Sequence, residues 1–137
     1  MEATGSNDSS VNPPEPTQIH ARLGSEAFWR IARAFYARIE TRADLRHMFP
    51  TDLTEPVRNQ AEFLIQYFGG PTAYSDRKGH PRLRMRHAPF AIGVRERNAW
   101  VACMEGALTD AAIPEPDRSV MSKYFANTAT FLMNADT

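Results

Sequence analysis

The residue whose chemistry stands out in the sequence is a histidine held between two prolines. His87 lies in the run GHPRLRMRHAPF over residues 79–90, with Pro81 before it and Pro89 after it. Proline suits the first turn of a helix, where its missing N–H has no partner to lose, and it disfavours helical geometry in the residue before it. The pattern predicts a helix of about two turns that begins at Pro81 and ends near His87.

Within that helix, the spacing decides which side chains share a face. Leu83 and His87 lie four positions apart and share one face, whereas Arg82 and Arg86 share a different one. A single imidazole on a segment held by prolines suits one large buried partner, and haem iron is a candidate because one histidine is enough to hold it. On spacing alone the alternative stays open, because a lone histidine is more commonly a surface or satisfied core residue.

The surrounding sequence predicts only helices. Apolar residues recur at three- and four-residue spacing in four stretches, 28–39, 57–68, 100–108 and 121–132. Ser25 and Thr54 are suitable N-caps for the first two of these helices. Short helices fit residues 18–23 and 42–48, while residues 71–79 are expected to form a loop. The expected fold class is therefore all-α.

Composition limits the class of protein. The chain has 137 residues, 42% of them hydrophobic, which fits one domain with a real core. Its formal net charge is zero, so nothing favours nucleic acid or an anionic membrane as a partner. The single cysteine, Cys103, excludes an internal disulfide, and the sequence has no Cys-x-x-Cys-His motif for covalent haem. With no apolar run near the ~20 residues of a membrane span and no secretory signal pattern, we expect a cytoplasmic protein.

The N-terminal stretch differs in composition from the rest of the chain. Residues 1–17 contain glycine, serines and prolines but no aromatic residue. Such a segment cannot bury enough apolar surface to offset the entropy cost of ordering it. We expect a disordered tail over residues 1–17 and a single domain over residues 18–137.

The histidine run and its neighbours together carry a family resemblance. The run at 79–90, the Gly69-Gly70-Pro71 before it and the Ala99-Trp100 after it resemble the second group of the truncated haemoglobins. The similarity extends from about His20 to Met133. The resemblance implies a shortened globin fold, a two-over-two helical sandwich around non-covalently bound haem b, in which His87 corresponds to the proximal iron ligand.

The resemblance also implies which residues meet the ligand on the other side of the iron. Tyr36, Gln60 and Trp100 match the ligand-facing positions of the family, and all three carry hydrogen-bond donors. Pro56 occupies the position where classical globins place a distal histidine, and its side chain cannot donate. On pattern alone, Tyr36 and Trp100 would be ordinary core residues, and Gln60 would lie at the solvent margin of its helix.

The walls of a haem pocket can be assigned in the same way. The side chains expected to contact haem are those of Phe49, Phe63, Leu64, Leu83 and Met85. Arg82 matches a position that pairs with a haem propionate, since a guanidinium suits a carboxylate. The alternative is that Arg82, Arg84 and Arg86 form a solvated basic patch.

The implied function is the binding of oxygen at a single haem iron, with nitric oxide and carbon monoxide as further gaseous ligands. Donors aimed at developing charge in a dry pocket are stronger than in water, so tight oxygen binding and slow release are expected. A redox enzyme on the same haem is the alternative, with nitric oxide dioxygenase or peroxidase-like activity and a separate reductase as electron donor. Either function is compatible with a monomer or a homodimer.

Overall fold

The computed structural model describes residues 12–135, and every regular element in that part of the chain is helical. The elements are η1 Pro16–Gln18, α2 Ile19–Leu23, α3 Ser25–Glu40, α4 Ala43–Arg46, α5 Thr54–Tyr67, α6 Ala73–Lys78, α7 Leu83–His87, α8 Val94–Asp110 and α9 Asp117–Phe131. The all-α prediction is therefore confirmed. None of the helices in residues 12–135 is long and apolar enough to cross a membrane.

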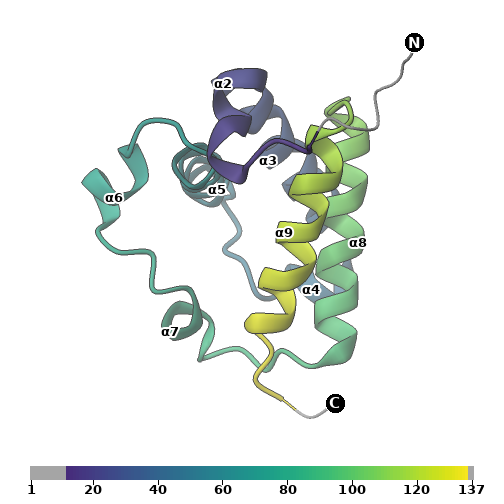
Figure 1. Cartoon of the computed structure of the whole chain (residues 1–137). Helices are drawn as coiled ribbons and strands as arrows, with labels where there is room; N and C mark the ends of the chain where they lie inside the picture. Colours follow the sequence, from purple (N-terminus) through teal and green to yellow (C-terminus); the bar gives the residue numbers. More distant parts are fainter. Residues whose placement is uncertain (1–11, 136–137) are drawn as a thin grey trace.

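Four long helices form the body of the molecule, arranged as two over two. α3 packs against both α5 and α8, and α8 and α9 run side by side (Figure 1). The shorter α6 and α7 lie at the left of Figure 1, α6 beside α5 and α7 below it, and form a strap that returns to the start of α8. This strap carries the histidine run.

Aromatic rings join the long helices in the core. Phe28, Phe35, Phe68 and Phe125 are almost completely buried. The ring of Phe68, at the end of α5, lies 5.9 Å from that of Phe28 in α3 and 6.4 Å from that of Phe125 in α9. Such pairs contribute ~0.5–1.5 kcal/mol each beyond the burial of their area. They hold three of the long helices in one fixed arrangement.

The strap differs from the sequence prediction, because residues 71–79 contain a helix. The loop predicted there is wrong: α6 spans Ala73–Lys78 and ends at Gly79, whose φ of 79° favours glycine. The Gln66 side chain of α5 holds its first turn by donating to the Ser75 hydroxyl at 2.7 Å and accepting from the Ser75 N–H at 2.9 Å. α6 buries only Tyr74, so it has no apolar stripe from which a helix could be predicted.

Ordered structure begins before the predicted domain boundary. η1 starts at Pro16, and a Cβ at Gly69 would lie only 1.9 Å from the Thr17 carbonyl oxygen. Gly69 also has a φ of 102°, so the close contact and the backbone both require glycine. Residues 1–11 of the predicted tail lie outside the described residues.

The cap predictions for the two central helices are also corrected. α3 begins at Ser25, so Gly24 with its φ of 82° is the cap residue. The Ser25 hydroxyl instead bonds to His20 Nε2 at 2.8 Å. α5 begins at Thr54, and the Asp52 carboxylate accepts the Thr54 N–H at 2.9 Å. Gly24 therefore caps α3 in place of Ser25, and the side chain that bonds the first turn of α5 is that of Asp52 and not of Thr54.

The start of α9 carries an ion pair with a buried carboxylate and a half-exposed arginine, which gives a prediction about stability. The Asp117 side chain is only 3% exposed, and both of its carboxylate oxygens accept from Arg22 Nε, at 2.8 and 3.0 Å. Asp117→Asn should lower the free energy of unfolding by about 1.5–3 kcal/mol, because a charged hydrogen bond is lost inside the protein. Chemical denaturation measures it.

The matched control is an ion pair on the surface. Glu26 and Arg33 are joined at 2.6 Å, but their side chains are 69% and 53% exposed. Glu26→Gln should therefore leave the unfolding midpoint almost unchanged. If Asp117→Asn and Glu26→Gln lose the same free energy of unfolding, burial of Asp117 does not strengthen its ion pair with Arg22.

Candidate functional site

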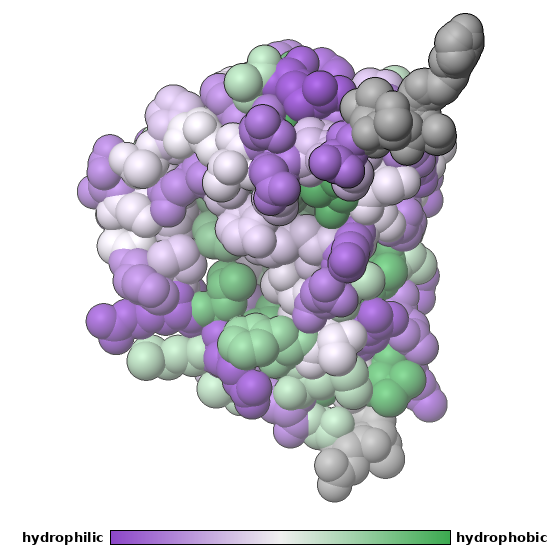
Figure 2. Space-filling model, in the orientation of Figure 1, coloured by the Kyte–Doolittle hydropathy of each residue, from purple (hydrophilic) through white to green (hydrophobic). Residues whose placement is uncertain are grey.

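A cavity of about 340 Å³ lies between α3, α5, α7, α8 and α9. Its lining is mainly apolar and aromatic. The face drawn in Figure 2 is hollowed between the strap and α9, with apolar surface inside the hollow and polar surface around it. A buried apolar cavity with a few polar groups is typical of a site for a small molecule or cofactor.

His87 enters this cavity from the last turn of α7. Its Nδ1 lies 2.7 Å from the Leu83 carbonyl oxygen. Since a carbonyl only accepts, Nδ1 carries the proton, and Nε2 keeps a free lone pair. Leu83 and His87 both line the cavity, as their spacing predicts. An imidazole fixed in this way through one nitrogen is suited to bind a metal through the other.

The start of α7 is not where the sequence predicts it. The helix begins at Leu83, after Pro81, and Arg82 has a left-handed conformation with φ 49° and ψ 54°. Arg82 and Arg86 therefore do not share a helix face. Arg86 lines the cavity, whereas Arg82 lies outside it, in a neighbouring groove beside Lys123.

Of the other side chains that the sequence predicts to contact haem, three line the cavity and one does not. The side chains of Phe49, Phe63 and Leu64 line the cavity. Met85 does not: it is 63% exposed, because it follows Leu83 by two positions and points away from the cavity.

A tyrosine hydroxyl stands on the cavity wall formed by α3. Tyr36 is buried, and burial raises the pKa of its hydroxyl above the ordinary value. The hydroxyl therefore stays protonated and available as a donor. The Tyr36 ring meets those of Phe35 and Phe49 edge-on, with centroids 4.9 and 5.4 Å away, and these contacts fix its direction.

Two further polar side chains line the cavity. Gln60 Oε1 is buried and has no hydrogen-bond partner within residues 12–135. A buried polar atom left unpaired costs ~1–3 kcal/mol, which a bound molecule can recover by giving the amide a partner. Trp100 also lines the cavity, with its indole ring 5.6 Å from Phe35 and 6.0 Å from Phe125. Its N–H can only donate.

These residues fit a haem group. One imidazole with a free nitrogen lies on α7, apolar rings form the walls, and α3, α5 and α8 contribute a hydroxyl, an amide and an indole N–H. Arg86 adds a guanidinium suited to a carboxylate.

Comparison with known proteins identifies the family. Residues 18–134 match the model of the bacterial-like globin family. The chain belongs to the bacterial-like globins. It is 37% identical over 112 residues to the group 2 truncated hemoglobin YjbI of Bacillus subtilis, covering 82% of this chain and 85% of that protein.

Solved structures of this family share the fold. The hemoglobin of Chloroflexus aurantiacus is 55% identical and matches with a TM-score of 0.83, over 88% of this chain and 99% of its own. The truncated oxygen-avid haemoglobin of Bacillus subtilis is 35% identical, with a TM-score of 0.82, over 85% of this chain and 98% of its own. The resemblance to group II truncated haemoglobins and the two-over-two globin fold are confirmed.

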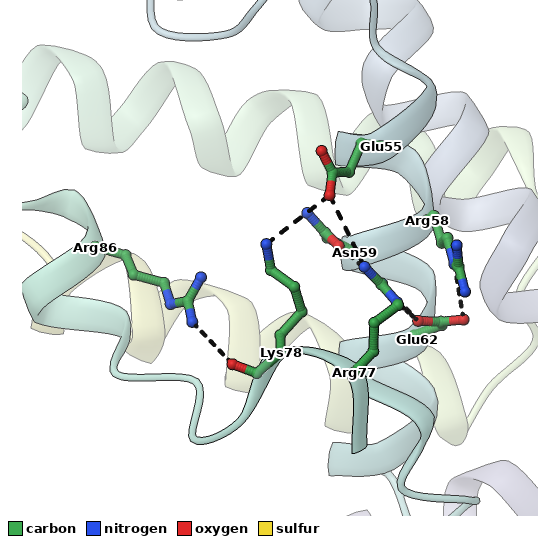
Figure 3. Close-up of polar contacts among 7 residues, drawn as sticks. All are labelled: Glu55, Arg58, Asn59, Glu62, Arg77, Lys78 and Arg86. Atoms are coloured by element: carbon green, nitrogen blue, oxygen red, sulfur yellow. Dashed lines mark hydrogen bonds and ion pairs between the residues drawn. The ribbon is translucent and has the colours of Figure 1, made fainter. Parts of the chain in front are cut away.

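In this globin, sequence reasoning missed three charged residues that line the cavity, which are Arg86, Glu96 and Arg97. Arg86 precedes His87 directly, and its guanidinium donates to the Lys78 carbonyl at 3.4 Å (Figure 3). The spacing in the sequence places Arg86 with Arg82 on a face different from that of His87, so it does not predict that Arg86 lines the cavity.

A polar cluster joins helix α5 of this globin to the strap. Arg77 donates to Glu62 from Nε at 3.1 Å and from Nη2 at 2.6 Å, and to the Asn59 side-chain oxygen at 2.8 Å. Arg58 donates to the other Glu62 oxygen at 3.2 Å (Figure 3). Glu55 lies 3.9 Å from both Arg77 and Lys78. Glu62 is thus the centre of the contact between α5 and α6.

This cluster predicts a pH-dependent contribution to stability. Burial alone raises the pKa of Glu62, but the hydrogen bonds and charges of Arg77 and Arg58 outweigh it and hold the pKa below its usual range. The stabilisation is therefore present above the unfolded-state pKa of ~4.3 and is lost as the pH falls through the lower folded-state value. Glu62→Gln should lower the free energy of unfolding by about 1–2 kcal/mol at pH 7.

Thermal unfolding at several pH values tests this prediction. The melting temperatures of the wild type and Glu62→Gln should converge as the pH falls below the folded-state pKa of Glu62. Glu55→Gln is the control, since Glu55 is 67% exposed and its ion pairs are long. If the melting temperatures of the wild type and Glu62→Gln differ by the same amount down to acid pH, an ionic role for Glu62 is contradicted.

Proposed function

We propose that this globin holds haem b non-covalently through His87 and binds oxygen or another diatomic ligand in the same cavity. When bound, the haem would supply the iron atom that takes the ligand. The observation that carries the proposal is one cavity that brings together the fixed His87 imidazole on α7 and the side chains of Tyr36, Gln60 and Trp100 on the other helices.

The chain's own residues have distinct roles in this proposal. Phe49, Phe63 and Leu64 keep water out of the cavity, and Leu83 fixes the ring direction of His87 through its carbonyl oxygen. We assign the propionate contact to Arg86, because Arg86 lines the cavity and Arg82 does not. A guanidinium pairs well with a carboxylate.

High affinity and slow release are part of the proposal. The Tyr36 hydroxyl, the Gln60 amide and the Trp100 indole N–H can each donate to a ligand that gains negative charge on binding. Such donors are strong because the cavity is mostly apolar and little water competes with them. One relative of known structure is described as oxygen-avid, which supports the same expectation for this chain.

Slow release also supports a second candidate function. A protein that releases oxygen slowly is a poor carrier, so the bound ligand could instead be consumed in a redox reaction. Nitric oxide dioxygenation or peroxidase-like turnover are the candidate reactions, with electrons supplied by a separate reductase.

Three measurements on the purified protein separate these possibilities. The absorption spectrum after addition of haem should show a Soret band, and the ferrous form should bind oxygen and release it slowly. A protein without a Soret band would contradict the haem proposal altogether. Rapid consumption of nitric oxide with a supplied reductant would favour the enzyme, and its absence would favour reversible binding.

A further inference from the structure

The helix that carries His87 packs only weakly against the core. α7 spans five residues and buries none of its side chains completely. Hydrophobic packing therefore does little to fix its position. Its other contacts are hydrogen bonds at its two ends and the Arg84 guanidinium, which lies 5.2 Å from the centre of the Phe131 ring at the end of α9. At its N-terminal side, the contact from Arg86 to the Lys78 carbonyl is long, at 3.4 Å.

The contacts at the other end include closer ones, and most of them come from Asn134. Asn134 follows α9, and its side-chain Nδ2 donates to the Phe90 carbonyl at 2.9 Å and to the His87 carbonyl at 3.4 Å. Its Oδ1 accepts the Ile92 N–H at 2.8 Å. The backbone N–H of Asn134 donates to the Ile92 carbonyl at 2.9 Å. One asparagine thus ties the exit of α7 to the end of α9.

We infer that Asn134 is a positioning residue for His87, an inference that rests on the proposed role of His87 as iron ligand. The His87 ring is bonded to the Leu83 carbonyl inside α7, so ring and helix move together. Holding the carbonyls of His87 and Phe90 therefore fixes where Nε2 lies in the cavity. Outer-shell contacts of this kind tune the ligand that they orient.

The inference predicts a change in the iron–histidine bond. In Asn134→Ala, α7 is released at its C-terminal end, so the iron–histidine stretching band of the ferrous protein should shift or broaden in resonance Raman spectra. Haem transfer to apomyoglobin should become roughly ten-fold faster, a factor equivalent to ~1.4 kcal/mol, about the contribution of one hydrogen bond.

Two further variants separate positioning from general stability. Asn134→Asp keeps an oxygen for the Ile92 N–H but offers no N–H to the two carbonyls, so it should change the Raman band as Asn134→Ala does. Asn127→Ala, a surface asparagine on α9, should leave the band unchanged. A lower melting temperature with an unchanged band in both Asn134 variants would overturn the inference.

A variant that removes the His87 side chain shows whether Asn134→Ala changes the Raman band through His87. In His87→Gly, added imidazole can take the place of the side chain without a link to α7. Adding Asn134→Ala to that background should leave the iron–imidazole band unmoved, and a shift there would contradict the route through His87. If His87→Gly kept its haem and ferrous spectrum without imidazole, the proposed iron ligand itself would be wrong, which is a separate outcome.

Discussion

His87→Ala should be purified with little or no haem, whereas His80→Ala should keep the haem content of the wild type. His87 offers the cavity a fixed imidazole with a free nitrogen. His80 is exposed, lies outside the cavity, and uses its Nδ1 to accept the Arg82 N–H at 3.1 Å. The measurement is the ratio of Soret to protein absorbance after purification, together with the spectrum of the ferrous form.

Comparing His87→Ala with His80→Ala shows whether a loss of haem is specific to His87. Both replace a histidine in the strap by alanine, and they lie seven positions apart, so a general effect on the strap should affect both. Free imidazole should restore a five-coordinate ferrous spectrum to His87→Ala once haem is added. Loss of haem in His80→Ala, with retention in His87→Ala, would reverse the assignment.

The long helices were predictable because their buried faces repeat apolar residues. Phe28, Phe35 and Ile39 in α3 follow helical spacing and are all fully buried. α6 could not be found in this way, because its first turn is held by the polar side chain of Gln66, which lies on another helix. A contact between distant residues leaves no local pattern in the sequence.

The site shows the same division between local and distant information. The shared face of Leu83 and His87 follows from four-residue spacing and needs no other element. The roles of Gln60 and Trp100 came only from the family resemblance, because spacing alone equally allows a solvent-margin glutamine and a core tryptophan. The pairing of Arg82 with Arg86 was wrong because the backbone at Arg82 turns into a left-handed conformation, which delays the start of the helix by two residues. Met85 was misplaced for a different reason, since it lies two positions from Leu83 and four-residue spacing puts only His87 on the face of Leu83.

Trp100→Phe should speed the release of oxygen by roughly ten- to a hundred-fold. The indole N–H is a donor inside a mainly apolar cavity, and a hydrogen bond to a charged group contributes ~1.5–3 kcal/mol. At ~1.4 kcal/mol for each factor of ten, that loss gives the stated range. Phenylalanine keeps the ring contacts with Phe35 and Phe125, so haem retention should change little. Stopped-flow oxygen dissociation from the ferrous protein measures the rate.

Two control variants decide whether the indole N–H itself is responsible. Trp29→Phe makes the same chemical change in a tryptophan that packs at the edge of the core and does not line the cavity, so its release rate should equal that of the wild type. Tyr36→Phe removes the neighbouring donor and should have a smaller effect, because the Gln60 amide and Trp100 can still donate. An unchanged rate in Trp100→Phe would make Trp100 a packing residue. The retention of oxygen would then depend on the Tyr36 hydroxyl and the Gln60 amide N–H, which can both donate.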